Sequence, residues 1–473
     1  MKVIDGAEYK RRIAALKSSV WYDGKLVEDI TDHPAFRGGI QSQAELYDLQ
    51  NEEEHQSITM SSSQFGTSYL IPRTKADLEK RRKLVQLWAR YTAGMMGRSP
   101  DYMNTVLASF AASKNLLENE ENCFPDRLQA FYEKAKAEDL SFTHTFINPQ
   151  NNRASLSFLD EDDQNARIVD KTEEGLVIRG AKLLATQGGM TDEVIVYSAP
   201  GASKKEYAYL FSIPTDTAGL KFVCRSSFGV DSSRFNSPLS SRFEEMDSLV
   251  LFDDVLVPWE RVFLYDNIRA ANQLYVKGKF TPMTLHQIVS RQVIKTEFVL
   301  GLAIKIVEEI QIEEYHHVQS KVAEMIKARE SLKALLLLSE NEALEDEAGV
   351  MVPARLPLYT AINEFQRFYP RFTEILQLLG ASGLVTLPSE DAFQSDLRED
   401  LNFYLRTGVS NGEDKVRLYR LAWDVAMSSF GSRQTLYERF FFGDPVRIEQ
   451  VIYQSCNKES YSQFAEEFLH KKS

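Results

Sequence analysis

Glu193-Val-Ile-Val-Tyr197 and Tyr207-Ala-Tyr-Leu-Phe211 are two short runs of β-branched and aromatic residues with turn-forming residues between them. Three further runs have the same texture, and no pattern of helical length separates them: residues 175–179, 220–224 and 249–252. Closely spaced strands without intervening helices are typical of a mostly antiparallel sheet or barrel. The segment 141–266 is therefore predicted to be a β domain.

The residues before this β domain have helical periodicity. One apolar face is spaced by four, three and four residues: Leu84, Trp88, Tyr91 and Met95. Gly94-Met-Met-Gly97 follows as a predicted break, and a new helix is predicted to begin at Ser99. Ser99 is a favourable N-cap, and Pro100 fits the first helical position, where no backbone N–H is needed. The segment 1–140 is therefore predicted to be helical.

The chain is predicted to be helical again from residue 267 to its end. One helix face repeats through a set of apolar residues: Val318, Val322, Met325, Leu332 and Leu336. Helices, then strands, then helices predict a composite α+β protein and not a doubly wound sheet. The predicted domains are residues 1–140, 141–266 and 267–473.

Composition and charge exclude several classes of function. The chain has 473 residues and a formal net charge of −13, and no basic cluster suggests a nucleic-acid partner. No stretch has the length of a membrane span, and residues 1–16 are charged with no apolar segment behind them. Cys123, Cys224 and Cys456 are too few and too widely spaced for a disulfide framework or a four-cysteine zinc site. We therefore expect a cytoplasmic protein without a membrane partner.

Motifs of common nucleotide, metal and hydrolase sites are absent. There is no G-x-G-x-x-G, G-x-x-x-x-G-K-[ST], H-E-x-x-H, C-x-x-C or G-x-S-x-G. His316 and His317 are adjacent, so on a helix they point about 100° apart and are badly placed to share a metal ion. No metal site is predicted. Residue spacing alone goes no further than a cytoplasmic α+β protein that we expect to be an enzyme.

Four longer segments carry a resemblance to a known family. They are Gly97-Arg-Ser-Pro-Asp-Tyr-Met-Asn104, Phe142-Thr-His-Thr-Phe-Ile-Asn-Pro-Gln-Asn-Asn-Arg153, Pro238-Leu-Ser-Ser-Arg-Phe-Glu-Glu-Met-Asp247 continuing to Phe252-Asp-Asp-Val-Leu-Val-Pro-Trp-Glu-Arg261, and Tyr437-Glu-Arg-Phe-Phe-Phe-Gly-Asp-Pro-Val-Arg447. In this order they resemble the oxygenase subunits of 4-hydroxyphenylacetate 3-monooxygenases, which are FADH2-utilising two-component aromatic hydroxylases. The four matches span most of the chain.

The resemblance implies both a fold and a reaction. The fold would be acyl-CoA-dehydrogenase-like, with an N-terminal helical domain, a central antiparallel β-barrel and a C-terminal four-helix bundle. The chain would be a homotetrameric flavoprotein of aromatic catabolism that uses reduced FAD and O2 to hydroxylate a phenol ortho to its hydroxyl, with 4-hydroxyphenylacetate as the expected substrate. Because the chain has no second nucleotide-binding signature, a separate NAD(P)H:flavin reductase would supply the reduced flavin.

The family's phenol site carries over to three residues of this chain, Arg98, Tyr102 and His144. The guanidinium and the positive end of the following helix would favour a phenolate. With a reference pKa near 6.5, His144 could accept the phenol proton, so the hypothesis makes it the general base while Arg98 and Tyr102 orient the phenol oxygen. Ser198 and Ala199 match a loop that closes over the substrate and excludes water.

The family's flavin site carries over to a larger set of positions. It comprises His144, Gln150, Asn151, Asn152, Arg153, Thr186, Gly443, Asp444, Pro445 and Val446. Arg153 is the expected partner of the pyrophosphate, because a guanidinium forks onto phosphate oxygens. Thr186 is expected to hydrogen-bond the isoalloxazine edge near the reactive carbon.

Three other functions remain open at this stage. A 4-hydroxybutyryl-CoA dehydratase shares the fold, but it needs an iron–sulfur cluster held by three cysteines and a histidine, and the three cysteines here lack the expected close pair although His286 lies in a comparable helix. An acyl-CoA dehydrogenase would need a carboxylate base and a CoA channel that the sequence does not reveal. A non-catalytic tetrameric scaffold would have no need of the phenol-binding trio. The identity of the phenol also stays open.

Overall fold

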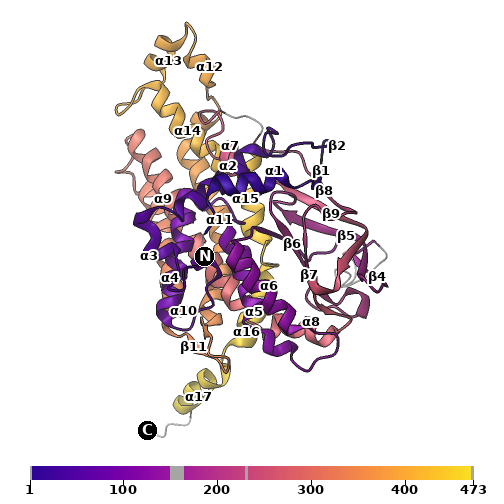
Figure 1. Cartoon of the computed structure of the whole chain (residues 1–473). Helices are drawn as coiled ribbons and strands as arrows, with labels where there is room; N and C mark the ends of the chain where they lie inside the picture. Colours follow the sequence, from indigo (N-terminus) through magenta and orange to yellow (C-terminus); the bar gives the residue numbers. More distant parts are fainter. Residues whose placement is uncertain (1–2, 150–163, 230–232, 470–473) are drawn as a thin grey trace.

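The computed structural model describes residues 3–149, 164–229 and 233–469. Two β-sheets lie beside a larger helical part, and both are visible in Figure 1, with the sheets on the right and the long helices on the left. Helices α12 and α13 project from one end of the helical part, and α17 projects from the other. Among the described residues, no helix is both long and apolar enough to cross a membrane.

The strands form two main sheets. The six-stranded sheet has the order β2-β1-β8-β9-β5-β4 and the four-stranded sheet has the order β10-β7-β6-β3. The strands are β1 Ser19–Tyr22, β2 Lys25–Leu26, β3 Phe142–Thr145, β4 Arg167–Lys171, β5 Gly175–Thr186, β6 Glu193–Tyr197, β7 Tyr209–Pro214, β8 Leu220–Cys224, β9 Asp247–Pro258 and β10 Val262–Tyr265. Every run that the sequence indicated as a strand lies wholly or mostly within one of them. A separate two-stranded ribbon joins β11 Leu344–Glu345 to β12 Met351–Val352.

The prediction of a closed antiparallel barrel is wrong for the part of the chain that the structure describes. The two sheets are open, and each ends in its own edge strands. Their facing sides share one apolar core, with Val194 and Phe211 from one sheet and Phe222 and Val250 from the other. Face-to-face packing buries both sheets without edge-to-edge closure, as in a sandwich. Most strand pairs are antiparallel, as expected, but β1 pairs with β8 and β3 with β6 in parallel.

The helical prediction for the N-terminal segment missed β1 and β2. Residues 19–22 are Ser-Val-Trp-Tyr, a run too short to stand out, and their register is set by pairing with β8, about 200 residues later in the chain. A strand that is specified by so distant a partner has little local signal. The N-terminal segment therefore contributes to a sheet as well as to the helices. The domain boundaries at 140 and 266 stay predictions.

Alternation along β6 connects the sandwich to the helices. Val194 and Val196 point into the core between the sheets, whereas Ile195 and Tyr197 point into the core shared with the helices. This follows from the two-residue period of a strand. All five residues of β6 are buried, since one face packs on the second sheet and the other on helices. The four-stranded sheet is thus a buried layer between the second sheet and the helical part.

The helices of the N-terminal segment lie before β3 in sequence, and some of them pack on the C-terminal part. They are α1 Gly6–Ala15, α2 Arg37–Leu49, α3 Gln56–Thr59, α4 Lys75–Tyr91, α5 Pro100–Ala111 and α6 Pro125–Glu138, and the one-turn α7 Ser240–Phe243 follows β8. Ser99 occupies the N-cap position of α5, and the predicted break between α4 and α5 is confirmed. Every residue of α5 is buried, and both α4 and α5 contact α9.

The C-terminal part is built around three long helices, α9, α10 and α11, that all contact one another. Its helices are α8 Ile268–Val276, α9 Phe280–Glu309, α10 His316–Asn341, α11 Arg355–Gly380, α12 Glu390–Phe393, α13 Arg398–Tyr404, α14 Gly412–Ala426, α15 Ser429–Phe440, α16 Pro445–Ser455 and α17 Lys458–Leu469. The apolar stripe predicted on α10 is buried at Val318, Met325 and Leu332. His316 and His317 are exposed at the start of α10.

Candidate active site

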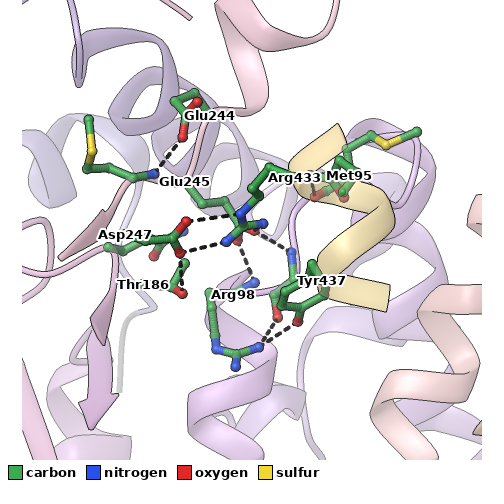
Figure 2. Close-up of polar contacts among 12 residues, drawn as sticks. Met95, Arg98, Thr186, Glu244, Glu245, Asp247, Arg433 and Tyr437 are labelled. Carbon is green, nitrogen blue, oxygen red and sulfur yellow. Dashed lines mark hydrogen bonds and ion pairs between the residues drawn. The ribbon is translucent and has the colours of Figure 1, made fainter. Parts of the chain in front are cut away.

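The Gly97–Arg98 backbone is fixed where the loop after α4 meets the residues just before β9. The N–H groups of Gly97 and Arg98 both donate to the buried Glu245 carboxylate, at 2.9 and 2.6 Å. A side chain at Gly97 would collide with Tyr437 of α15, because its Cβ would lie 2.2 Å from the Tyr437 hydroxyl oxygen. Glycine therefore allows Tyr437 to approach the loop, and the Tyr437 hydroxyl accepts a hydrogen bond of 2.7 Å from Arg98 Nη1 (Figure 2).

The structure brings together the three residues expected to bind a phenol. Tyr102 lies one turn into α5, and its ring centroid is 4.2 Å from Arg98 Cζ, which is a close cation–π contact. The Tyr102 ring also packs edge-on against the His144 ring of β3, with centroids 5.7 Å apart. All three side chains are buried. Arg98 and His144, which are 46 positions apart in sequence, thus lie on either side of Tyr102 where the sheet meets the helices.

The Arg98 guanidinium is buried, and within the described part of the chain its hydrogen-bond partners are uncharged. Its hydrogen bonds go to the Tyr437 hydroxyl and to the Gly97 carbonyl, and it forms no ion pair within the described residues. Its Nε is also buried and makes no hydrogen bond to any described residue. A buried charge is costly without a partner of opposite charge. The arrangement therefore suits an anionic or strongly hydrogen-bonding ligand atom at this guanidinium.

His144 is a neutral imidazole in this setting. It is buried, and its Nδ1 lies 2.6 Å from the Tyr197 hydroxyl oxygen. Burial, together with the positive charge of Arg98, holds the pKa of His144 well below its usual range. At physiological pH the ring is therefore neutral, and a single N–H proton sits on either Nδ1 or Nε2. Which nitrogen carries it decides whether His144 offers a donor or an acceptor to a ligand.

A charged network lies behind the loop and reaches the end of β5, as Figure 2 shows. Thr186 Oγ1 donates to Asp247 Oδ1 at 2.8 Å, and Arg433 of α15 binds both oxygens of Asp247. Arg433 Nη1 also lies 3.5 Å from Glu245 Oε2. Although burial opposes it, the charges of Arg433 and Arg225 hold the pKa of Asp247 far below its usual range. This network connects the Thr186 side chain to the residue that fixes the Arg98 backbone.

A second buried ion cluster supports the other side of Tyr437. Arg291 and Lys295 of α9 both bind the Glu438 carboxylate, at 2.7 and 2.8 Å, and their side chains are fully or almost fully buried. Despite burial, these two cations lower the pKa of Glu438 to about 2. Burial raises the pKa of Tyr437 to about 12, against the opposing charges of Arg98 and Arg291. Tyr437 is thus a protonated phenol held between three arginines, because Arg433 also lies over its ring.

The loop expected to close over a substrate begins at the end of β6. Ser198 is buried and its Oγ donates to the Tyr209 carbonyl, whereas Ala199 is half-buried. The Tyr275 hydroxyl of α8 donates to the Ser198 carbonyl at 2.5 Å. Asn272, one turn before Tyr275, accepts from the Gly201 N–H and donates to the Ala202 carbonyl. One face of α8 therefore holds the loop in place.

The predicted flavin residues are placed only in part. Gln150, Asn151, Asn152 and Arg153 lie outside the described residues. Thr186 ends β5 beside β3, where the Thr143 hydroxyl donates to the Thr186 carbonyl.

The segment Gly443–Val446 contains the N-terminus of α16. The Asp444 carboxylate accepts from the Val446 and Arg447 N–H groups, so the helix N-terminus is already capped by an acidic side chain. This capping disfavours a phosphate at these N–H groups. The segment is nevertheless close to the site, because the Phe441 ring, two residues earlier, lies 5.7 Å from Arg98 Cζ.

Sequence reasoning missed several residues that complete this site. They are Phe146, Tyr197, Glu245, Asp247, Tyr275, Arg291, Arg433 and Tyr437. Glu245, Asp247 and Tyr437 lie within the quoted family segments, so the segments themselves were the available signal. Tyr197 ends the β6 run and gives no sign of a polar role until its hydroxyl is seen beside His144. Arg291 sits on a buried face of α9, where a charged residue among apolar ones was a possible clue.

The fold and site together define a class of protein. An oxygen-tolerant archaeal 4-hydroxybutyryl-CoA dehydratase from N. maritimus superposes with a TM-score of 0.89 at 20% identity, covering 99% of this chain and 95% of its own. An acyl-CoA dehydrogenase from Geobacillus kaustophilus has a TM-score of 0.50 at 12% identity, covering 79% and 82%. At such low identity these likenesses concern the fold alone. They define the fold as acyl-CoA-dehydrogenase-like.

The chain belongs to the 4-hydroxyphenylacetate 3-hydroxylase family. The family's N-terminal profile matches residues 5–264 and its C-terminal profile matches residues 271–470. A protein of Bacillus subtilis (strain 168) named "Probable 4-hydroxyphenylacetate 3-monooxygenase" is 51% identical over 99% of both chains. The oxygenase component of a 4-nitrophenol 2-monooxygenase from Rhodococcus sp is 32% identical over 95% of this chain and 89% of its own. A solved oxygenase component of 4-hydroxyphenylacetate 3-monooxygenase, complexed with FAD and 4-hydroxyphenylacetate, has a TM-score of 0.94 at 42% identity and covers 98% of both chains.

These findings do not favour the dehydratase alternative. The dehydratase shares the fold at only 20% sequence identity. The monooxygenases are 51% and 42% identical to this chain over nearly its whole length. Within the part of the chain that the structure describes, the one cluster with metal-ligand geometry is Glu52, Glu54 and His55, which contains no cysteine. Cys123, Cys224 and Cys456 are all free thiols. An iron–sulfur cluster requires thiolate ligands, and no such group of cysteines is found among the described residues.

Proposed function

We propose that this protein is the oxygenase component of a two-component flavin monooxygenase that hydroxylates a phenol ortho to its hydroxyl and yields a catechol. Reduced FAD and O2 would be the co-substrates, and 4-hydroxyphenylacetate the phenol. Family membership and the full-length similarity to named monooxygenases support this reaction. The single structural observation that carries it is the buried Arg98 guanidinium, which has no carboxylate partner among the described residues and lies next to a neutral histidine.

The phenol oxygen would bind between Arg98, Tyr102 and His144. A free phenol has a reference pKa of about 10, and a nearby guanidinium lowers that value because it stabilises the anion. The negative charge of a phenolate also replaces the counter-ion that Arg98 lacks among the described residues. A phenolate oxygen pushes electron density into the ring and makes the ortho carbon a better nucleophile. Arg98 therefore both binds the substrate and activates it.

The residues present fit a flavin on the sheet side of this site. Thr145 follows His144 on β3, and its Oγ1 is buried without a hydrogen bond to any described residue. Thr186 ends β5, which contacts β3, and Asp247 orients its hydroxyl. We assign Thr186 and Thr145 to hydrogen bonds with the ring system, and Gln150, Asn151, Asn152 and Arg153 to the rest of the cofactor. When bound in its reduced form, FAD supplies the electrons that activate O2.

The same site needs to exclude water from the reacting centre, because leakage yields hydrogen peroxide in place of product. Four aromatic rings, three from helices α5, α8 and α9 and one from the loop after β3, surround Tyr197: Phe110, Tyr275, Phe280 and Phe146. The loop that starts at Ser198 is held by hydrogen bonds from α8, the helix that contributes Tyr275. We assign Ser198 and Ala199 to substrate contact, and Gly443, Asp444, Pro445 and Val446 to the flavin through atoms other than the capped N–H groups of α16.

Several further assignments accompany this function. A separate NAD(P)H:flavin reductase supplies the reduced flavin, since two of the three named relatives are oxygenase components. We also propose a homotetramer in the cytoplasm, and domains that divide near residues 140 and 266. Each rests on the family resemblance.

The function is tested by mixing the purified protein with reduced FAD under anaerobic conditions and then adding oxygenated buffer, with and without 4-hydroxyphenylacetate. The proposal expects a catechol product by chromatography, and flavin reoxidation kinetics that differ from those of free reduced FAD. Kinetics identical to free FAD, with peroxide and no catechol, would contradict it. That second result would favour the non-catalytic scaffold.

A further inference from the structure

His144 and Tyr197 are placed by neighbouring strands of the four-stranded sheet. β3 and β6 pair in parallel, with His144 opposite Ile195, so Tyr197 lies two residues further along on the same face. Tyr197 points into the core shared with the helices, and His144 faces the Tyr102 ring of α5. The Tyr197 hydroxyl oxygen reaches His144 Nδ1 at 2.6 Å. This short distance therefore follows from strand register and does not depend on a loop.

The Tyr197 ring has little freedom to move. It stacks on Phe146 with centroids 5.0 Å apart and an interplanar angle of 9°. Phe110 and Phe280 contact it edge-on from α5 and α9, at 5.4 and 6.0 Å. Tyr275 closes a further side at 6.3 Å. A ring that is packed on several sides holds its hydroxyl at one position, so the hydrogen bond to His144 is preorganised.

The direction of this hydrogen bond follows from the partners that are present. Within the described residues, the Tyr197 hydroxyl has His144 Nδ1 as its one hydrogen-bond partner. If Nδ1 carried the proton, the hydroxyl would accept it and its own buried hydrogen would have no acceptor, which is costly. Burial also raises the pKa of Tyr197 well above its usual range, so the hydroxyl keeps its hydrogen. Donation from Tyr197 to Nδ1 satisfies both groups.

We infer that Tyr197 is a positioning residue that fixes the tautomer of His144, with the ring proton on Nε2 and Nδ1 accepting the tyrosine hydroxyl. This inference rests on the proposed function and deepens it. Nε2 makes no hydrogen bond to any described residue, so its N–H is the group that His144 offers to a ligand. His144 is then a hydrogen-bond donor to a phenolate oxygen, and not the general base that the sequence suggested.

A donor at this position changes the fate of the phenol proton. Arg98 and His144 Nε2 both donate, so the site selects the phenolate, and binding a neutral phenol releases its proton to the solvent. In the described part of the chain, the other ionisable groups that pack against the imidazole are Tyr102 on α5 and Tyr197 on β6, and Tyr275 on α8 packs against Tyr197. Burial raises the pKa of each of these tyrosines, so none is an anion near neutral pH. The phenolate would therefore pair with the positive charge of Arg98, which lies over the Tyr102 ring.

The inference is tested with 4-nitrophenol as a spectroscopic ligand, in the absence of flavin and O2. The visible band of the bound phenolate, followed against pH, gives the pH at which the bound phenol ionises. On wild-type protein, bound 4-nitrophenol should ionise at a lower pH than 4-nitrophenol in free solution. Tyr197→Phe should raise that midpoint by about one pH unit, a tenfold loss of preference for the phenolate, because Nδ1 loses the donor that fixed the tautomer.

Tyr209→Phe is the matched control. This variant also removes a buried tyrosine hydroxyl. In wild type, however, the Tyr209 hydroxyl donates to the Ala166 carbonyl, and the Tyr209 ring lies in the core between the sheets. The control should ionise 4-nitrophenol as wild type does. Equal midpoints for Tyr197→Phe and wild type would overturn the inference while leaving the proposed function intact. Failure of wild type to bind 4-nitrophenol would contradict the proposed phenol site itself and the inference with it.

A measurement on the wild-type protein covers the case in which Tyr197→Phe does not fold. ¹⁵N-histidine labelling and nuclear magnetic resonance report which nitrogen of each neutral imidazole is protonated, and the His144 signals are identified by their loss in His144→Gln. The inference requires protonated Nε2 and unprotonated Nδ1. A protonated Nδ1 would overturn it.

Discussion

The Asp247 carboxylate accepts two hydrogen bonds from the Arg433 guanidinium, at 2.7 and 3.0 Å, and this pair joins β9 of the sandwich to α15 of the helical part. Asp247 also orients the Thr186 hydroxyl, and Arg433 approaches the Glu245 carboxylate that holds the Arg98 backbone (Figure 2). One ion pair therefore positions the two sides of the site relative to each other.

Removing the Asp247 charge should destabilise the protein. Asp247→Ala leaves the Arg433 guanidinium, which is only 13% exposed, without its main counter-ion, and we expect a loss of roughly 3 kcal/mol. The thermal midpoint measures this change. Asp253→Ala is the control, because its pair with Lys221 is solvent-exposed and such pairs contribute little. Equal midpoints for the two variants would contradict the role given to Asp247.

The same pair has a defined pH dependence. The folded-state pKa of Asp247 lies below its ordinary value of 3.8, so the folded protein binds the proton less readily than the unfolded chain. The stability contributed by the pair is complete above the unfolded-state pKa and is lost as the pH falls towards the folded-state value. The gap in thermal midpoint between wild type and Asp247→Asn should therefore narrow as the pH falls below about 4.

Replacing Arg98 should uncouple oxygen consumption from hydroxylation. Arg98→Ala removes the cation that favours the phenolate, and we expect kcat/KM for the catechol to fall by about 10² to 10³, as for other buried donors at a developing charge. Arg98→Lys keeps the charge but loses the planar fork, so it should recover only part of the activity. The measurement is the ratio of catechol to hydrogen peroxide. Arg90→Ala, which breaks an exposed pair with Glu297, is the control and should leave that ratio unchanged.

Asp101 should make the folded protein less stable as the pH rises through the acid range. Burial raises the pKa of Asp101 from 3.8 to about 6, and its Oδ1 has no hydrogen-bond partner among the described residues. Between these two values the unfolded chain releases the proton first, so ionisation favours unfolding, and the loss is complete above about pH 6. Asp101→Asn should gain thermal stability over wild type between pH 4 and pH 7. A difference that does not change with pH would contradict this account.

Freeing the loop after β6 should weaken substrate binding more than it slows the chemical step. Asn272→Ala removes the hydrogen bonds to Gly201 and Ala202, and two such bonds together correspond to about a tenfold change. We expect KM for 4-hydroxyphenylacetate to rise by about that factor, with more peroxide released. Gln273→Ala changes the neighbouring residue of α8 and serves as the control. An unchanged KM in Asn272→Ala would show that α8 does not hold the loop in its closed position.

Local patterns predicted much of this fold. The β6 and β8 runs coincide with the strands found, and the break before Ser99 falls between α4 and α5, because these features depend on nearby residues. The closed barrel was a tertiary expectation, and it failed because strand propensity does not say whether sheet edges meet. β1 was missed for a related reason, since its partner β8 lies far along the chain.

The candidate site was predicted from family segments and not from spacing. Those segments indicated Arg98, Tyr102 and His144, which the structure brings together. They gave no role to Tyr197, because the hydrogen bond to His144 arises only when β3 and β6 pair in register. The depressed pKa of His144 was also out of reach, since it depends on burial and on the distance to Arg98 in the folded chain.

The central claim, that this chain inserts an oxygen atom from O2 into a phenol, is tested most directly with ¹⁸O2. Purified protein is given reduced FAD, 4-hydroxyphenylacetate and ¹⁸O2 in unlabelled water, and the catechol is analysed by mass spectrometry. The account predicts one ¹⁸O atom in each catechol molecule, and loss of the labelled product in Arg98→Ala. Catechol without label, or reduced FAD consumed with peroxide as the sole product, would contradict it.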